Sequence, residues 1–295
     1  MKKMTVLEKH GFQGISRWPT QEQLRKPGAV ADYFMNGYAP NEPLISKSNN
    51  VTAFGSCFAG NVSRYMRQKG YSVNGHDWDH NQSDIIRIDE IMVHTPALLM
   101  QFEWAFSNRT LESIFIGGAE EKIQTYHNLE KCRELIRKTD FFIITLGLTE
   151  AWYDKEKKQY LWKFVPNKKL NSGRFENRFV KFSENLENIK RIYNLIRANL
   201  PSAKILFTLS PIPLLGSYQG RSVISANTAS KSTLKAALHE FLANTLEQDP
   251  ALYYFPSYEL INHYIEDPWM EDKRHLKQDA IIKIMEIFDY YYLKY

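Results

Sequence analysis

A hydroxyl and a thiol stand side by side where a short apolar run meets an amphipathic helix. The apolar run covers residues 51–54, Gly55 ends it, and Ser56 and Cys57 follow. Residues 58–68 then repeat apolar side chains at helical spacing. The first turn of a helix leaves backbone N–H groups unpaired and carries a partial positive charge, which favours an anion. The pattern predicts an exposed nucleophile, and the alternative is that two small residues serve packing or cap the helix.

An acid and an imidazole have the spacing to serve such a nucleophile. Asp272 and His275 are three residues apart and precede the last predicted helix. A nucleophile needs a base within hydrogen-bond reach, and the base needs a group that orients it. In a tight loop the carboxylate of Asp272 can hold one ring nitrogen and leave the other for the nucleophile. The same spacing also arises by chance, so an ordinary surface histidine is the competing interpretation.

The elements that must position these residues alternate along the chain. Strands are expected at residues 51–54, 71–73, 141–147, 204–210 and 253–255, and helices at 58–68, 95–106, 126–138, 182–199, 227–245 and 279–292. Thr95 is expected to cap the second of these helices, and residues 160–177 to form a loop with a hairpin. Alternation of this kind predicts a three-layer α/β/α fold with a central parallel sheet, which binds ligands at the carboxyl ends of its strands. The polar groups expected at those ends are Ser56, Cys57, Thr149, Glu150, Ser210, Asp272 and His275.

Two regions outside that pattern are predicted separately. Residues 1–50 carry few periodic signals and several prolines, so we expect an irregular N-terminal arm with a short helix near 30–35. Residues 51–295 are expected to form one domain. The loop 74–81 holds two histidines and two aspartates, but their spacing fits no metal-site pattern, so no metal is expected.

Composition excludes several classes of protein. The 295 residues carry a net charge of +5 without a block of like charge, so nucleic acid is not an expected partner. No apolar run approaches the length of a membrane span, and the N-terminus lacks the apolar core of a signal peptide. The two cysteines, Cys57 and Cys132, are too few for a disulfide framework or a zinc site. We therefore expect a cytoplasmic protein with a free thiol in the turn after residue 55.

Several stretches resemble one known family. Residues 54–59 read Phe-Gly-Ser-Cys-Phe-Ala, and further similar stretches are 145–152, 209–214, 226–227, 230–231, 254–259 and 274–275. In this order they resemble the GSCFA family, which is placed near the SGNH/GDSL hydrolases. The resemblance implies a flavodoxin-like fold and acyl-ester chemistry. It also implies that Gly55, Gly147, Thr149, Glu150, Ser210 and Asn227 line the oxyanion and substrate-binding region.

This chain departs from the SGNH pattern at two places. SGNH enzymes show Gly-Asp-Ser at the first strand end, and alignment on Gly55 puts Cys57 in the nucleophile's position, with Ser56 as the alternative. A thiolate is the better nucleophile near neutral pH. At the next site an oxyanion-binding Asn is replaced by Thr149 and Glu150, and an ionised Glu150 would repel a developing oxyanion. The second donor of such enzymes has no clear match, and residues 94–95 are where it is expected.

Three functions remain open at this point. The first is an esterase or O-acyltransferase that acts on a carbohydrate or other small acylated substrate; it needs no cofactor, and acyl-CoA is a candidate donor. The second is a non-catalytic module that binds carbohydrate or nucleotide-sugar, with Trp152, Tyr153, Trp162 and Trp269 as stacking platforms or as core. The third is an interaction domain that uses the N-terminal arm. Fold analogy does not decide among them.

Overall fold

The structure is a computed structural model. It describes residues 16–55, 57–74, 93–107, 114–116, 119–121, 129–161, 165, 167–170 and 172–295. The chain separates into two compact units, residues 1–39 and 40–295. The predicted division at residue 50 into an arm and one domain stays a prediction.

The first unit contains two short helices, α2 (Gln21–Leu24) and α3 (Ala29–Tyr33). Thr20 begins α2 through a reciprocal capping box: its hydroxyl accepts from the Gln23 N–H at 3.3 Å, and the Gln23 side chain accepts from the Thr20 N–H at 2.8 Å. This arrangement satisfies two backbone donors that the helix itself leaves unpaired. Helix α3 corresponds to the short helix expected near residues 30–35.

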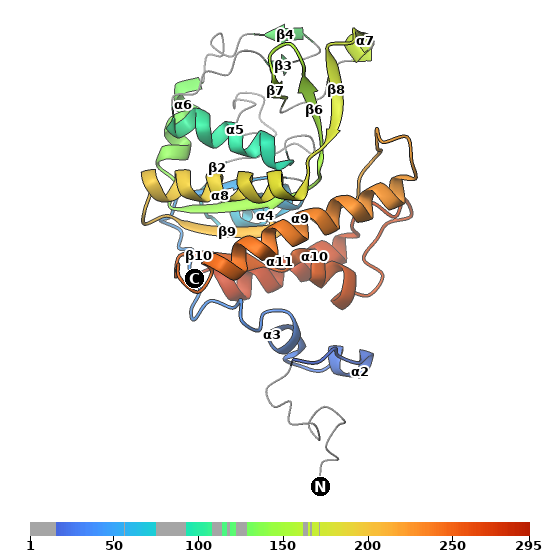
Figure 1. The fold of residues 1–295 in the computed structure, drawn as a ribbon. Helices are drawn as coiled ribbons and strands as arrows, with labels where there is room; N and C mark the ends of the chain where they lie inside the picture. Colours follow the sequence, from blue (N-terminus) through green and yellow to red (C-terminus); the bar gives the residue numbers. More distant parts are fainter. Residues whose placement is uncertain are drawn as a thin grey trace. The chain divides into compact units, whose positions relative to one another are not determined.

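The second unit is built on a five-stranded sheet (Figure 1). Its strands are β1 (Val51–Phe54), β2 (Val73–Asn74), β5 (Phe141–Leu146), β9 (Lys204–Leu209) and β10 (Leu252–Phe255). The spatial order is β2-β1-β5-β9-β10, and every neighbouring pair is parallel. Strand β5 is buried at all six positions, as a central strand covered on both faces requires. The predicted fold class is confirmed. If these five strands are numbered 1 to 5 along the chain, their spatial order is 2-1-3-4-5, which is the flavodoxin arrangement.

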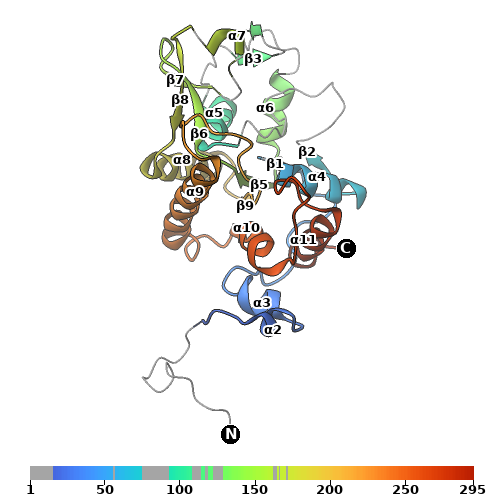
Figure 2. The ribbon, with the colours of Figure 1, turned by 90° about the vertical axis from the view of Figure 1, so that its right-hand side faces the viewer.

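Helices cover both faces of this sheet (Figure 2). Helices α4 (Cys57–Gln68) and α11 (Gln278–Tyr292) pack together on one face. On the other face α5 (Thr95–Phe106), α8 (Phe182–Asn199) and α9 (Val223–Thr245) form a row, and α6 (Leu129–Arg137) packs on α5. After β10 the chain forms α10 (Ser257–Glu259) and a π-helical turn, η2 (Leu260–Tyr264). Among the described residues, no helix combines the length and apolar character that a membrane span needs.

A second, antiparallel sheet follows β5 directly. It consists of β6 (Glu150–Asp154), β7 (Gln159–Tyr160) and β8 (Phe175–Phe179) in the order β7-β6-β8, with the short helix α7 (Asn167–Leu170) between β7 and β8. Trp152, Leu161, Val165 and Phe175 form its small apolar core. Buried Asp154, at the end of β6, forms an ion pair with the partly exposed Arg174, which precedes β8. A hairpin formed by β3 (Ile114–Ile116) and β4 (Ala119–Glu121) completes the described strands.

Some predicted element ends were wrong. The cap of α5 is His94, not Thr95: its Nδ1 accepts a hydrogen bond from the Ala97 N–H at 3.1 Å. An imidazole can cap because its unprotonated nitrogen accepts a bond as a Ser or Asp oxygen would. Helix α9 begins at Val223, four residues before the predicted start, because the Ser222 hydroxyl caps it. Residues 160–177, predicted as a loop with a hairpin, include the end of β7, the helix α7 and the start of β8, and both strands pair with β6 rather than with each other.

Replacement of Gly55 by alanine is expected to lower the free energy of unfolding by roughly 2–5 kcal/mol, from backbone strain plus overpacking. Gly55 has φ of 125°, and a Cβ there would lie 2.4 Å from the carbonyl oxygen of Thr145. Gly216→Ala is the control, since no described atom lies within 4 Å of a Cβ at that position. Urea denaturation of both variants checks this, and equal midpoints would show that the close approach of β1 and β5 is not a constraint.

Candidate active site at the carboxyl edge of the sheet

The order of the strands places a topological switch point between β1 and β5. The chain moves from β1 outward to β2 and then back across to β5, so connections on the two sides of this pair run in opposite directions. In open α/β sheets ligands bind beyond the carboxyl ends of the strands at such a switch point. Gly55 follows β1 there, and Gly147 follows β5. Both must be small, because a Cβ on Gly147 would lie 2.4 Å from a methyl carbon of Val93.

The candidate nucleophiles belong to this edge by their position in the chain. Cys57 is the first residue of α4 and comes three residues after the last residue of β1. Ser56 lies outside the described residues. The choice between Ser56 and Cys57 therefore stays a prediction from the sequence.

Asp272 and His275 form the pair that the sequence predicts. Asp272 Oδ2 lies 2.5 Å from His275 Nδ1, while Asp272 Oδ1 accepts from the backbone N–H groups of Arg274 and His275, both at 3.0 Å. These bonds hold the pKa of the Asp272 carboxyl well below its usual range, the backbone N–H groups foremost. Asp272 is therefore ionised at neutral pH and accepts the Nδ1 proton. Half of the His275 side chain, 51%, is exposed to solvent.

The second ring nitrogen of His275 faces a donor. Arg274 Nη1 lies 3.2 Å from His275 Nε2. A guanidinium only donates, so Nε2 accepts and carries no proton in this arrangement. The tautomer with hydrogen on Nδ1 and a lone pair on Nε2 is the one that a general base requires. For a nucleophile to reach Nε2, the Arg274 guanidinium must move aside.

A buried lysine relates this pair to the strand ends. Lys231 on α9 is 2% exposed, and its Nζ donates to the carbonyls of Gly147 at 2.7 Å and Ser210 at 2.8 Å. Those residues directly follow β5 and β9. Burial lowers the pKa of Lys231, and charge repulsion from Arg274 lowers it further. The Asp272–His275 turn thus lies near the carboxyl ends of β5 and β9, and in Figure 1 the segment before α11 lies on that side of the sheet.

Thr149 is held at the same edge through its backbone. Its N–H donates to the Ser230 hydroxyl of α9 at 2.9 Å, and its carbonyl accepts from the Val180 N–H at 2.8 Å. Its own hydroxyl is buried and has no hydrogen-bond partner in the described part of the chain. A buried hydroxyl without a partner is costly and rare in proteins. Thr149 therefore has an unused donor, as the sequence-based hypothesis for an oxyanion site requires.

Glu150 binds a neighbouring loop. Its Oε1 accepts from the Ser217 hydroxyl at 2.6 Å and from the Gln219 amide at 3.0 Å, and its Oε2 accepts from the Tyr218 N–H at 2.9 Å. The Tyr218 ring also packs edge-on against Trp152 at 4.8 Å. Three donors satisfy the carboxylate, so the described geometry commits it to the loop 217–219.

We expect Glu150→Gln to loosen the loop 217–219 without unfolding the protein. The amide replaces a charged acceptor with a neutral one and brings a donor toward Ser217 or Tyr218, so at least one bond is lost. Amide hydrogen exchange at Tyr218 should become at least about tenfold faster, equivalent to one charge-assisted bond of about 1.5 kcal/mol. Glu156→Gln is the control, because the Glu156 side chain is 71% exposed. Unchanged protection at Tyr218 would contradict the anchoring role.

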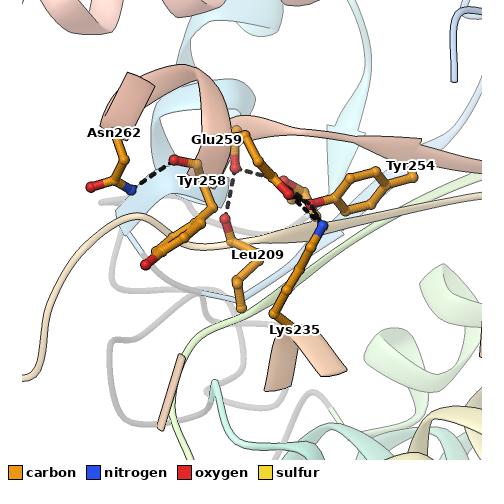
Figure 3. A network of polar contacts seen from close by, with 8 residues as sticks. Leu209, Lys235, Tyr254, Tyr258, Glu259 and Asn262 are labelled. Carbon is orange, nitrogen blue, oxygen red and sulfur yellow. Dashed lines mark hydrogen bonds and ion pairs between the residues drawn. The ribbon is translucent and has the colours of Figure 1, made fainter. Parts of the chain in front are cut away.

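The remaining predicted site residues are held by short contacts. The Ser210 hydroxyl accepts from the Ile212 N–H at 3.3 Å, and the Asn227 side chain accepts from the Leu214 N–H at 3.1 Å. Both shape the chain that leaves β9. Beyond β10, the Ser257 hydroxyl donates to the Leu209 carbonyl at 2.8 Å. Figure 3 shows the adjoining network, in which Lys235 and Tyr254 both contact Glu259.

The predicted location of a second oxyanion donor is fully buried. His94 is 3% exposed, and burial lowers the pKa of its imidazole to about 3, so it is neutral at physiological pH. The Thr95 hydroxyl donates to Asn185 at 2.7 Å and accepts from Asn188 at 3.1 Å. These groups connect α5 to α8. The Thr95 hydroxyl already donates its one hydrogen to Asn185. A second oxyanion donor from residues 94–95 therefore stays a prediction that these contacts do not support.

Only some of the residues considered for aromatic stacking or for a metal site lie in the described part of the chain. Trp152 belongs to the core of the antiparallel sheet, and Tyr153 packs on Tyr160 and under Arg178. Trp269 is half-buried, and Trp162 lies outside the described residues. Of the loop 74–81, only Asn74 is described. Within the described ranges no group of three or more metal-ligating side chains occurs.

Ser230 and Lys231 belong to a stretch that resembles the GSCFA family, but the sequence-based hypothesis does not include them among the site residues. A pattern could have singled them out: Ser230, Leu234, Ala237, Leu238 and Phe241 form the buried side of α9, and Lys231 lies among them. A lysine within an apolar stripe must find a buried acceptor or a partner. The carbonyls at two strand ends supply the acceptors.

The fold and the edge groups define a doubly wound α/β protein of the flavodoxin type with a His–Asp pair at its carboxyl edge. The family follows from the sequence: the GSCFA family model matches residues 50–288, and the chain belongs to that family. The predicted family membership is thereby confirmed. The comparison with curated proteins finds no match.

Solved structures with a similar chain path include carbohydrate esterases. The family 3 carbohydrate esterase of Clostridium thermocellum is 10% identical, with a TM-score of 0.40 over 84% of this chain and 94% of that chain. A family 3 carbohydrate esterase from Talaromyces cellulolyticus is 13% identical, with a TM-score of 0.38 over 83% and 94%. The periplasmic domain of a Salmonella ser. Paratyphi A lipopolysaccharide acetyltransferase is 13% identical, with a TM-score of 0.31 over 90% and 91%.

Proposed function

We propose that this protein transfers an acyl group from an ester or thioester by way of a covalent intermediate on Cys57 or Ser56. The observation that carries the proposal is the Asp272–His275 pair at the carboxyl edge, in which Nδ1 contacts the carboxylate at 2.5 Å and Nε2 lies 3.2 Å from the Arg274 guanidinium. An oriented imidazole with this tautomer is the base that a hydroxyl or thiol nucleophile needs. The GSCFA motif supplies both nucleophile candidates at the first strand end.

The proposed reaction has two balanced steps. In the first, the thiol or hydroxyl attacks the acyl carbon, its proton passes to His275 Nε2, and the departing alkoxide or thiolate takes that proton as it leaves. In the second, water or an alcohol attacks the acyl-enzyme, gives its proton to Nε2, and releases the acid or a new ester while the nucleophile regains the proton. Asp272 stabilises the imidazolium in both steps. Water as acceptor makes the protein an esterase, and an alcohol makes it an O-acyltransferase.

Charge on the carbonyl oxygen needs hydrogen-bond donors. We assign the Thr149 hydroxyl to this task, because it is buried and has no partner among the described residues. The backbone N–H groups at the start of α4 are the second source. Glu150, which would oppose an oxyanion, is bound by the three donors of the loop 217–219.

Cys57 is the nucleophile that we favour. It occupies the register of the SGNH serine relative to Gly55, and it begins α4, where the helix dipole stabilises a thiolate. The substrate that we propose is a small acylated molecule, with an acylated carbohydrate as the first class to test and acyl-CoA as a donor. No cofactor is needed for this chemistry.

Turnover of a chromogenic acetyl ester and of acetyl-CoA tests the reaction class. Release of acetate in water alone supports an esterase, and acetate transfer that requires an added sugar alcohol supports an acyltransferase. A carbohydrate that binds without turnover of either donor would favour the alternative, a non-catalytic binding module.

A further inference from the structure

A buried ammonium without a described counter-ion is the most unusual group outside the proposed reaction. The Lys231 side chain is 2% exposed, and its only hydrogen-bond partners within the described chain are the carbonyls of Gly147 and Ser210. Burial, with Arg274 nearby, lowers the pKa of its amine to about 7. An unpaired buried charge costs stability, so a hydrophobic side chain of the same length would serve packing alone better. The two hydrogen bonds that Lys231 donates to carbonyls offset this cost and indicate a specific task.

The two carbonyls identify that task. Gly147 and Ser210 directly follow the adjacent strands β5 and β9, and the Ser210 N–H already pairs with Leu146 at 2.8 Å. A single amine on α9 thus joins two chains at the point where they leave the sheet and diverge. One residue earlier on α9, Ser230 holds the Thr149 N–H at 2.9 Å. Two consecutive side chains of α9 therefore fix both ends of the turn 147–149.

A second lysine on the same helix shows the ordinary arrangement. Lys235 lies one turn after Lys231, and its Nζ pairs with the Glu259 carboxylate and donates to the Tyr254 hydroxyl at 2.9 Å. Figure 3 shows this pair beside Leu209. Lys235 connects α9 to α10 through a carboxylate, as a half-buried lysine usually does. It makes no described contact with the turn 147–149.

We propose that Lys231 is a positioning residue, whose amine holds the turn 147–149 in the geometry that aims Thr149 at the reacting carbonyl. The proposal rests on the proposed function for the identity of the reaction, but the clamp itself is a property of the fold. Lys231 acts through Gly147 and Thr149 and does not touch the substrate. Displacement of a donor by about 1 Å can lower a rate about 100-fold, so the clamp affects the rate of acyl transfer more than substrate binding.

The experiment compares Lys231→Met with Lys235→Met and Lys231→Gln in the full chain. Methionine keeps the length of the lysine stem without a donor, whereas glutamine retains two N–H donors. We expect Lys231→Met to lower kcat on a chromogenic acetyl ester about 10- to 100-fold, with KM changed less than about threefold. Lys231→Gln should recover part of that loss. Lys235→Met should keep kcat within about threefold of the parent, because it leaves the turn 147–149 unaltered.

Hydrogen exchange separates the clamp from the reaction. In Lys231→Met the amides of Gly147 and Thr149 should exchange at least about tenfold faster, because the Gly147 and Ser210 carbonyls lose the donor that they share. If the parent turns over no ester, the proposed function fails, and exchange alone decides the clamp. Unchanged exchange in both Lys231 variants, or an unchanged kcat in Lys231→Met, would overturn the proposal. If methionine prevents folding, Lys231→Gln carries the same comparison.

Discussion

His275→Ala is expected to lower kcat/KM for acetyl-ester turnover by about 100- to 10,000-fold, the usual contribution of a positioned general base. The variant keeps the turn 272–275, because the Asp272 carboxylate still accepts from two backbone N–H groups. It removes the group to which we assign the transfer of the proton from the nucleophile to the leaving group. Steady-state kinetics with a chromogenic acetyl ester measures the loss.

His239→Ala is the matched control for this variant. His239 is exposed on α9, so its removal tests for a general effect of losing an imidazole. We expect kcat/KM of the control within about twofold of the parent, as for other surface substitutions. Equal activity of His275→Ala and the parent would show that the Asp272–His275 pair is a surface feature without a catalytic role.

Asp272→Asn is expected to lower kcat by a factor approaching that of His275→Ala, with little change in KM. The carboxylate accepts the Nδ1 proton at 2.5 Å, and this bond places the lone pair on Nε2. The amide NH2 of the substituted side chain would donate to Nδ1 instead and move the imidazole proton to Nε2, where it blocks the base. A wrong tautomer on an intact frame is known to cost a catalytic triad about 10,000-fold.

The pKa of the Asp272 carboxyl determines how the rate loss in Asp272→Asn depends on pH. Its folded-state pKa is lowered, so the stability that it adds is present above the unfolded pKa, about 3.9, and is lost as the pH falls toward the lower folded value. Between about pH 6 and 9 the carboxylate does not titrate. The pH–rate profile of the parent, measured across that window beside that of Asp272→Asn, should therefore contain no ionisation step that belongs to Asp272. An alanine at this position that keeps full activity would exclude the orienting role.

The sheet could be predicted from the sequence because its strands are buried on both faces. Residues 141–146 and 204–209 are short, predominantly apolar runs rich in β-branched and aromatic side chains, which favour a central parallel strand. Helix α8 was equally clear, since its apolar spacing and the Pro201 that follows fix both the type and the end of the element. Together these elements gave the layers and the edge at which the site lies.

The antiparallel sheet and the clamp could not be predicted in this way. Strand β6 begins with Glu150 and ends with Asp154, and both carboxylates are stabilised by distant partners, Ser217 and Arg174 among them. Such pairings have no local pattern. Lys231 has a local signal, its place in the apolar stripe of α9, but the two strand-end carbonyls that accept from it belong to distant segments and have no such signal.

The pattern of the sequence does not decide between Ser56 and Cys57 as the nucleophile. Gly55 brings the end of β1 close to Thr145, since a Cβ there would lie 2.4 Å from the Thr145 carbonyl oxygen. Adjacent side chains leave the backbone in different directions, about 180° apart in a strand and about 100° apart in a helix. We therefore expect one of Ser56 and Cys57, and not both, to carry the acyl group.

The most direct measurement of the central claim is the intact mass of the protein after rapid acid quench with a chromogenic acetyl ester or acetyl-CoA. We predict that the parent gains one acetyl group, that Cys57→Ala and His275→Ala do not, and that Ser56→Ala still does. Loss in Ser56→Ala with retention in Cys57→Ala would move the nucleophile to Ser56 and leave the reaction in place. Absence of acetylation in the parent with either donor, or acetylation that survives in both Cys57→Ala and Ser56→Ala, would contradict covalent acyl transfer at this turn.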